Sequence, residues 1–264
     1  MNSLITFLGT GGGRNVVASQ ELATGGIVLN LNNTQFHLDP GPGSAAYARK
    51  YKIDYKKTSV ILASHHHIDH ANDVNLVIDA ITNGRIKKKG HYICNQNAQD
   101  NVLTKYHKDA LEKISVLNKK SKPILIDGVK ISATETKNHD EGIGFKFKTA
   151  NFCIGYISDT AYSSAIANQF KGCNVLIINN GAPFKKKFKQ HFSSEDSVNT
   201  IKKIKPKLAI LTHFGNSMIQ AKPIYEAREI QKQTGTQVVA AYDGMILDLG
   251  NYSIEEDQKS LGEY

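Results

Sequence analysis

One short segment constrains this chain more than any other. Ser64-His65-His66-His67-Ile68-Asp69-His70 places four of the ten histidines within six positions. The apolar run at 59–63 before it is typical of a buried strand. Residues 74–81 after it carry apolar side chains at helical spacing, and Gly84 ends that pattern. A tight loop between such a strand and such a helix gathers its side chains in one small volume, so we expect the chain to fold around a metal site.

The order of residues within this loop predicts room for two metal ions. His65 and His67 lie two positions apart and can reach the same ion. Asp69 and His70 come after the bend and can reach a second ion. Imidazole is a ligand suited to zinc, and a carboxylate adds neutralising charge. We expect His66 to point away from these four side chains, as a structural residue or at the rim.

Strand and turn signals along the rest of the chain predict an α/β fold. The first half is expected to be mostly strand with one or two helices, and the second half shows the same pattern of strands and helices. The economical arrangement is two sheets face to face with helices outside. Strands are expected at 3–8, 26–31, 35–39, 59–63, 91–94, 124–134, 143–149, 152–157, 175–178, 208–212, 237–242 and 245–249. Helices are expected from Val74 to Gly84, from about Ser193 onward, and from Pro223 to Gly235.

Length and composition suit a single domain over residues 1–264. The hydrophobic fraction of 40% is enough to bury a sizeable core without stabilising cross-links, and no linker-like stretch divides the chain. The three cysteines, Cys94, Cys153 and Cys173, form no CxxC pair and are expected to be buried in a reducing compartment. The N-terminus lacks the basic region of a signal peptide, and no apolar stretch could span a bilayer. We therefore expect a cytoplasmic protein without a membrane partner.

The chain is basic, with a formal net charge of +9 and a pI near 9.3. Its lysines cluster at 87–89, 119–122, 185–189 and 202–207. These clusters are either solvated faces or a surface that attracts a polyanion or a phosphorylated substrate, and composition favours neither interpretation. The chain has no tryptophan and no aromatic-rich basic tract, so we do not expect a stacking platform for single-stranded nucleic acid.

Three further polar residues, His139, Asp159 and His213, each follow a predicted strand. A lone histidine or aspartate at a strand end is more often structural or solvated than functional. Taken together, however, they follow the segment His65-x-His67-x-Asp69-His70 in a telling order. This segment resembles the HxHxDH signature of the metallo-β-lactamase superfamily, in which a His, an Asp and a last His follow, each at a strand end. The resemblance covers nearly the whole chain.

This resemblance implies a four-layer αββα sandwich with two mixed sheets, outer helices and a dinuclear metal site. One metal would be held by His65, His67 and His139, the other by Asp69, His70 and His213, with Asp159 bridging them. Two cations about 3.5–4 Å apart repel, so a shared carboxylate and a shared hydroxide are expected between them. Asp69 is also expected to be catalytic, because it can orient the attacking water. Zinc is the expected metal, with manganese or iron as the alternatives.

His191 precedes His213 by 22 residues and makes the chain similar to the tRNase Z-type branch of the superfamily. In that branch a histidine at this place donates to the scissile phosphate or the leaving oxygen. The resemblance thus implies phosphodiester cleavage with His191 as a catalytic residue, against a helix-capping or surface histidine as the plainer interpretation. The long tRNA-clamping arm of the branch is missing between His139 and Asp159. Smaller phosphodiesters are therefore at least as good candidates as tRNA, and the expected substrate is a nucleotide, a cyclic phosphate or RNA.

Two features beside the expected site are secondary. Gly11-Gly12-Gly13-Arg14 meets neither nucleotide-binding motif, so we expect a tight turn at the rim, where Arg14 is a candidate phosphate contact. Asp39 is expected to support the metal ligands from behind. No motif surrounds His37, His91 or His107.

Two other functions stay open at this point. The same scaffold hosts thioesterases, lactonases and β-lactamases, and fold alone does not decide the substrate. His191 and the basic surface argue against these, though weakly. A non-catalytic nucleic-acid-binding relative is disfavoured because every expected metal ligand is present. The expected partner is a phosphate-containing small molecule or RNA as substrate, and a homodimer stays open.

Overall fold

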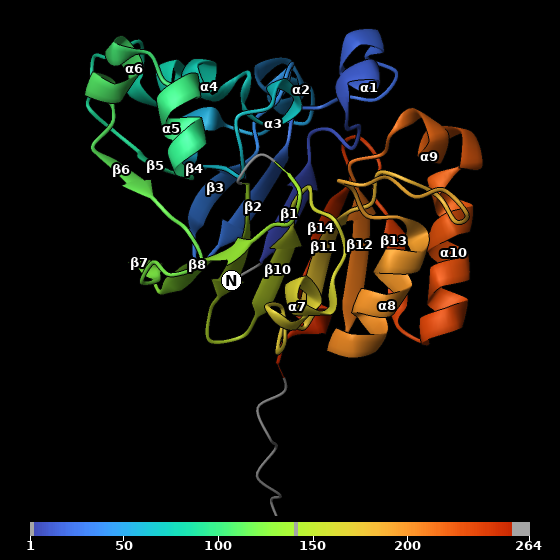
Figure 1. Ribbon diagram of the computed structural model, residues 1–264. Helices are drawn as coiled ribbons and strands as arrows, with labels where there is room; N and C mark the ends of the chain where they lie inside the picture. The colour runs from blue at the N-terminus through green and yellow to red at the C-terminus, as the bar shows by residue number, and fades with distance from the viewer. Residues whose placement is uncertain (1–2, 140–141, 255–264) are drawn as a thin grey trace, which may run out of the picture.

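Two mixed sheets, each of seven strands, lie face to face in this computed structural model, which describes residues 3–139 and 142–254 (Figure 1). The first sheet has the order β14 (Ile246–Asp248), β1 (Leu4–Phe7), β2 (Ile27–Leu31), β3 (Thr34–Leu38), β4 (Thr58–Ala63), β5 (His91–Cys94) and β6 (Lys113–Val116). The second has the order β13 (Gln237–Ala240), β12 (Leu208–Thr212), β11 (Val175–Asn179), β10 (Cys153–Ile157), β9 (Ile143–Lys148), β8 (Val129–Glu135) and β7 (Ile124–Ile126).

Each sheet contains a run of parallel strands, and these runs determine where the polar strand ends meet. Strands β3 to β6 are parallel in the first sheet, and β10 to β13 are parallel in the second. The carboxyl ends of parallel strands share one edge of a sheet. The ends of β10 and β12 therefore share one edge of the second sheet, and the end of β4 lies at the same end of the molecule. All the expected metal ligands except His139, which comes after β8, follow these strand ends.

A continuous apolar core fills the space between the sheets. Both sheets contribute large side chains to it, including Phe7, Phe36, Phe145 and Phe147, all of them fully buried. Because both faces of the central strands are covered, their sequences are apolar at nearly every position, as in β11 and β12. The rule that predicted buried strands at 59–63, 175–178 and 208–212 is thus confirmed.

Helices cover the outer faces and complete the expected four layers. The first sheet is covered by α2 (Ser44–Lys50), α3 (Ile68–Ala71), α4 (Val74–Thr82), α5 (Gln96–Val102) and α6 (Lys105–Ala110). The second is covered by α8 (Ser194–Ile204), α9 (Asn216–Ala221) and α10 (Pro223–Thr234), with α7 (Ser164–Asn168) beside α8. In the part of the chain that the structure describes, no helix is long and apolar enough to cross a bilayer.

The long helices begin and end as the sequence predicts. Ser193 and Asp196 form a reciprocal capping box at the start of α8. Pro223 opens α10, and Gly235 ends it in the left-handed conformation with φ 71°. All three cysteines are buried, and the Sγ atoms of Cys153 and Cys173 lie 3.3 Å apart under the helices of the second sheet.

Several short elements were not predicted: the helices α1 (Arg14–Ser19), α2, α3, α5, α6, α7 and α9, the strand β6, and the 3-10 turns at Tyr55–Lys57 and Gly250–Tyr252. The unpredicted helices have at most seven residues, too few to show a helical period in their apolar positions. Their clearest signals are local caps. The side chain of Asn95 accepts from the amide of Ala98 before α5, and that of Thr104 accepts from the amide of His107 before α6.

Candidate metal centre

The histidine-rich loop leaves the end of β4 and turns at once into the short helix α3. Asp39 holds the turn, because its two carboxylate oxygens accept hydrogen bonds from the amide and the hydroxyl of Ser64 at 2.6 and 2.7 Å. His65 lies before the turn, and Asp69 and His70 lie on α3. The loop thus presents His65 and His67 together, with ring centroids 4.6 Å apart, and presents Asp69 and His70 from the helix.

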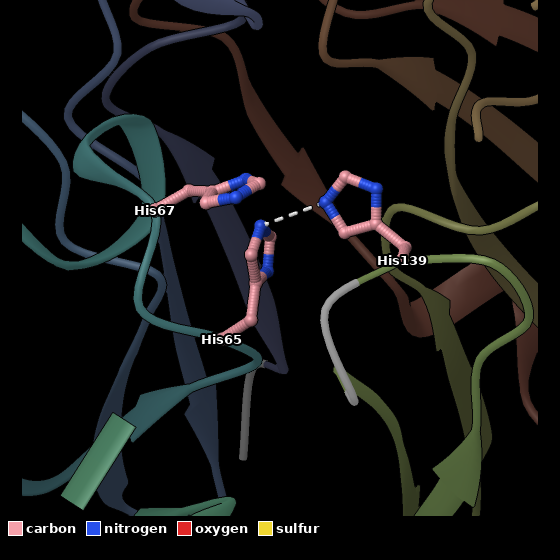
Figure 2. A group of neighbouring side chains, drawn as sticks. All are labelled: His65, His67 and His139. Carbon is pink, nitrogen blue, oxygen red and sulfur yellow. Dashed lines mark hydrogen bonds between the residues drawn. The ribbon is translucent and has the colours of Figure 1, made fainter. Parts of the chain in front are cut away.

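A first group of candidate ligands consists of His65, His67 and His139. One nitrogen from each ring lies within 4.8 Å of the others. Figure 2 shows the three rings turned toward one another, with Nε2 of His139 3.2 Å from Nε2 of His65. His139 comes from the segment after β8 in the second sheet, whereas His65 and His67 follow β4 in the first. This group therefore brings together residues from both sheets.

A second group consists of Asp69, His70, Asp159 and His213, all buried. Nε2 of His213 lies 3.1 Å from Nε2 of His70 and 3.2 Å from Oδ2 of Asp69. His213 directly follows β12 and adopts a left-handed backbone with φ 60°. A Cβ atom on Gly12 would lie 2.3 Å from the His213 ring, so this glycine is required for the close approach of the two segments.

Asp159 lies between the two groups. Its Oδ2 atom is 3.3 Å from Nε2 of His213, 3.4 Å from Nε2 of His70 and 3.6 Å from Nε2 of His139. Burial opposes ionisation of this carboxyl, but the surrounding imidazoles outweigh burial and hold the pKa of Asp159 well below its usual range. One carboxylate oxygen therefore faces ligand atoms of both groups, as a bridging ligand must.

The donor set fits two divalent cations. In both facing pairs, His65–His139 and His70–His213, two imidazole nitrogens are within about hydrogen-bond distance, and at most one proton can lie between them. Burial lowers the pKa of His139 to about 4 and that of His65 below its usual range, which favours the neutral imidazole that binds metal. Burial also disfavours charge on His70, yet the carboxylates of Asp69, Asp159 and Asp39 raise its pKa, so this half of the cluster favours a positive charge.

Asp39 supports the cluster from behind, as the sequence predicts. Its Oδ2 atom lies 2.8 Å from Nδ1 of His70 and accepts a hydrogen bond of 2.6 Å from the hydroxyl of Tyr156. A carboxylate on Nδ1 orients the ring and directs Nε2 toward the cluster. Asp39 itself has a left-handed backbone with φ 50°.

The glycine-rich turn after β1 contacts the cluster directly. The amide of Gly13 donates a hydrogen bond of 2.7 Å to Oδ2 of Asp69. Asp243 anchors the turn, because its carboxylate accepts from the amide of Thr10 at 2.8 Å and from the amide of Ala23 at 2.8 Å. The glycine-rich turn is therefore part of the site, and Asp243, in the turn before β14, has a structural role in it.

His191 faces the cluster from its open side. Its Nδ1 atom lies 3.5 Å from Oδ2 of Asp159, and its ring centroid lies 5.1 Å from that of His139. It is the partly exposed member of a third group with His139 and Asp159. Burial lowers the pKa of His191, and the charge of Asp159 opposes this. The structure thus places His191 beside the candidate ligands His139 and Asp159.

A cleft of about 360 Å³ opens beside His191 and His213. Its described lining consists of Gly12, Gly13, Arg14, Asn15, Val16, Gly181, Phe188, His191, His213, Gly215, Asn216 and Ser217. This volume is within the range of small-molecule sites in proteins. Arg14 lies at this cleft, in agreement with its expected place at the rim.

The remaining histidines lie outside the three groups. His66 belongs to none of them, although it follows His65 directly. His37 is fully buried and donates to the carbonyl of Gly25, and His91 bonds to the hydroxyl of Ser115. Sequence reasoning missed two residues that contact Asp39 and Asp159. Tyr156 looks like an ordinary packing residue within its strand, whereas Asn179 directly follows the expected strand 175–178, so the signal of a polar residue after a buried strand could have found it.

Comparison with known proteins gives a family and a set of similar folds. A family model described as a β-lactamase superfamily domain matches residues 34–214. An uncharacterised protein of Methanocaldococcus jannaschii is 36% identical over 256 residues, which cover 94% of this chain and 95% of that protein.

Three solved structures share the fold at low sequence identity. The metallo-β-lactamase fold protein YhfI of Bacillus subtilis matches with a TM-score of 0.79 at 15% identity, over 94% of this chain and 100% of the other. A diphosphatase of the PhnP family matches with a TM-score of 0.70 at 20% identity, over 94% and 97%. The short form of human tRNase Z matches with a TM-score of 0.71 at 15% identity, over 92% and 98%.

Proposed function

The chain belongs to the β-lactamase superfamily, and from this membership we propose that it is a hydrolase that uses two divalent metal ions to cleave a phosphodiester. We assign the metal ligands as His65, His67, Asp69, His70, His139, Asp159 and His213. When bound, the metal pair supplies a water of lowered pKa as nucleophile and polarises the phosphate. Imidazole and carboxylate donors suit zinc best, with manganese or iron as alternatives.

The chain's own residues prepare this reaction in two ways. Asp69 is oriented by the amide of Gly13 and can accept a hydrogen bond from the attacking water, which directs the water toward the phosphorus. Asp159 offers one oxygen to both ligand groups and so keeps them at a constant separation.

The observation that carries the phosphodiester proposal is the position of His191. Its Nδ1 atom lies 3.5 Å from Oδ2 of Asp159, at the mouth of the cleft, so a phosphate between the metals and the cleft would meet this ring. An imidazole N–H there can donate to a phosphate oxygen or to the leaving oxygen.

The cleft and the chain between the ligands favour a small substrate. From β9 to β10, residues 143–157, the chain forms a hairpin, and residues 140 and 141 lie outside the described part. No room is left there for a tRNA-clamping arm. Arg14 at the cleft and the basic surface suit a phosphate group. We therefore propose a nucleotide, a cyclic phosphate or a short RNA as substrate; the names of the diphosphatase and the tRNase Z agree with phosphate-ester chemistry.

A substrate screen tests this function. Protein loaded with Zn²⁺ or Mn²⁺ is expected to hydrolyse bis(p-nitrophenyl) phosphate, and an Asp159→Ala variant is expected to be inactive. Thioesters and lactones serve as competing substrates in the same assay. Turnover of either of these without any phosphodiester cleavage would contradict the proposal and favour a thioesterase or lactonase on the same scaffold.

A further inference from the structure

A lysine-rich loop forms one wall of the cleft and carries an exposed aromatic ring. Residues 183–192 lie in the connection between β11 and α8, and Lys185, Lys186, Lys187 and Lys189 surround Phe188 in the sequence. The side chain of Phe188 is 50% exposed, although it lines the cleft together with His191. An aromatic ring at the wall of a polar cleft presents a large apolar face against which a ligand can pack.

Hydrogen bonds fix both ends of the loop that carries Phe188, which restricts the positions that this side chain can adopt. The amide of Phe184 donates a hydrogen bond of 2.8 Å to the carboxylate of Glu226 on α10, and the amide of Lys185 donates one of 2.8 Å to Glu195 on α8. Ala182 pairs with the other end of the loop through its hydrogen bonds to Phe192 and Ser194. These contacts hold both ends of the loop against the two helices that cover the second sheet.

The rest of the cleft offers hydrogen-bonding groups without negative charge. Asn15, Asn216 and Ser217 line it together with Arg14. None of these side chains hydrogen bonds to another group within residues 3–139 and 142–254, and no carboxylate lies among the described lining residues. The cleft therefore has unused donors and acceptors, one cation and one aromatic face, all next to the metal ligand His213.

We propose that this cleft binds the nucleobase of a nucleotide whose phosphate lies at the metal centre, and that Phe188 stacks on the base. The proposal rests on the proposed phosphodiesterase function, because it takes the phosphate to lie beside His191. Every base has a π face, so stacking on an aromatic side chain is available to all of them. The amides of Asn15 and Asn216 can bond to the polar edge of a base, which a plain sugar phosphate lacks.

Binding measurements on metal-loaded protein test this site. We expect adenosine 5′-monophosphate to bind about tenfold more tightly than ribose 5-phosphate, which differs by the base alone. Phe188→Leu keeps an apolar side chain but removes the ring, and it is expected to bring the two dissociation constants to within about twofold. Lys187→Ala removes a neighbouring charge, and it is expected to weaken both ligands by a similar factor and leave their ratio unchanged.

A spectroscopic variant gives a direct readout that does not depend on activity. The chain has no tryptophan, so Phe188→Trp introduces a single reporter of the proposed stacking contact. Adenosine 5′-monophosphate is expected to quench its emission, whereas ribose 5-phosphate is not. Tyr225→Trp, at an exposed position on α10 that is 55% accessible and outside the cleft lining, is the matched control and is expected to respond to neither.

The outcomes separate this inference from the proposed function. Equal affinity of wild type for the two phosphates, or full retention of the preference in Phe188→Leu, overturns the nucleobase site even when bis(p-nitrophenyl) phosphate is cleaved. A preference for the nucleotide that is lost in Phe188→Leu supports the site. If that preference appears in a protein that cleaves no phosphodiester, the site stands as a nucleotide-binding cleft and the proposed hydrolysis is wrong.

Discussion

Asn179 donates a hydrogen bond of 2.8 Å to Oδ1 of Asp159, which leaves Oδ2 as the oxygen that faces the histidines. Asn179 ends β11, and Asp159 follows β10, its parallel neighbour. The pairing of these two strands therefore orients the carboxylate that lies between the two ligand groups. The same amide group lies 3.1 Å from the hydroxyl of Tyr156, which in turn donates to Asp39.

Removing this hydrogen bond is expected to weaken metal binding without unfolding the protein. Asn179→Leu keeps the side-chain volume but leaves Oδ1 of Asp159 buried without its donor. Loss of a group that orients a metal ligand typically lowers metal affinity by about 10- to 100-fold. Competition with a chromogenic zinc chelator measures the change. Asn75→Leu, which removes a hydrogen bond to Val102 outside the ligand groups, is the control and is expected to bind metal like wild type.

Asp159 and His66 are expected to respond in opposite ways to substitution. Asp159→Ala removes the oxygen that faces both ligand groups, so the purified variant is expected to retain less than one metal equivalent and almost no hydrolase activity. His66→Ala is expected to hold close to two equivalents, because His66 belongs to none of the three ligand groups. Elemental analysis of both variants beside wild type decides this, and equal metal loss in both would show that the loop geometry is misassigned.

Metal removal is expected to lower thermal stability. Without cations, the buried carboxylates and imidazoles of the cluster lose the charges that compensate them. A metal at about 1,000 times its dissociation constant stabilises a protein by about 4 kcal/mol. Dialysis against a chelator is therefore expected to lower Tm by several degrees, and added Zn²⁺ is expected to restore it. The Asp159→Ala variant should show little response to the chelator, and a wild type that shows none would contradict the metal assignment.

Much of the centre could be predicted because its ligands follow rules that are visible along the chain. His65, Asp159 and His213 each come after an apolar run that is recognisable as a buried strand. Since the strands β4, β10 and β12 belong to parallel runs, their polar successors meet at one edge. The residues that the sequence pattern selects after these strands are therefore the ones that the sheet topology brings together.

The residues that support the centre could not be predicted in the same way. Tyr156 occupies a strand position, and only the packing of the two sheets shows that it contacts Asp39. Asn179 follows the expected strand 175–178, but only the pairing of β10 with β11 shows that it contacts Asp159. Phe188 was not recognised as a candidate from the sequence, because the run of charges at 185–189 in which it lies is typical of a solvated face. A search for an aromatic-rich basic tract gives no weight to a single ring such as this one, which the fold brings to the wall of the cleft.

Acid is expected to destabilise the protein through His37. Burial of the fully enclosed ring lowers the pKa of His37 to about 4, although the hydrogen bond to the carbonyl of Gly25 and the charge of Asp39 oppose this shift; Tyr55 is its other ionisable neighbour. The unfolded chain binds this proton near pH 6.5, so stability is complete above that pH and is lost as pH falls toward 4. A difference of about 2.5 pKa units corresponds to about 3 kcal/mol over the whole window.

Urea unfolding at pH 7.5 and pH 5 measures this effect. Wild type is expected to lose about 2 kcal/mol more between the two pH values than His37→Gln, which cannot titrate. The metal ligands titrate equally in both proteins, so the difference between them isolates His37. An identical loss in the two proteins would mean that the folded ring takes up its proton at about the same pH as the unfolded chain.

The substitution His191→Ala is expected to separate chemistry from metal binding. His191 faces Oδ2 of Asp159 at 3.5 Å and is the partly exposed member of its group, so its loss should leave both metals bound. A positioned donor to the phosphate or the leaving oxygen typically contributes about 10²- to 10⁴-fold in rate. We therefore expect kcat on a dinucleotide or a cyclic nucleotide to fall by a factor in this range, with two metal equivalents retained by elemental analysis.

The size of this loss should depend on the leaving group. The p-nitrophenolate released from bis(p-nitrophenyl) phosphate needs little protonation, so His191→Ala should slow this substrate much less than it slows an alkoxide-releasing diester. His191→Gln keeps an N–H donor but cannot deliver a proton, and it should recover part of the rate only on the activated substrate. A uniform loss on both substrates would assign His191 to phosphate binding rather than to protonation of the leaving oxygen. A loss of metal along with the rate would instead make His191 a ligand, as its grouping with His139 and Asp159 allows.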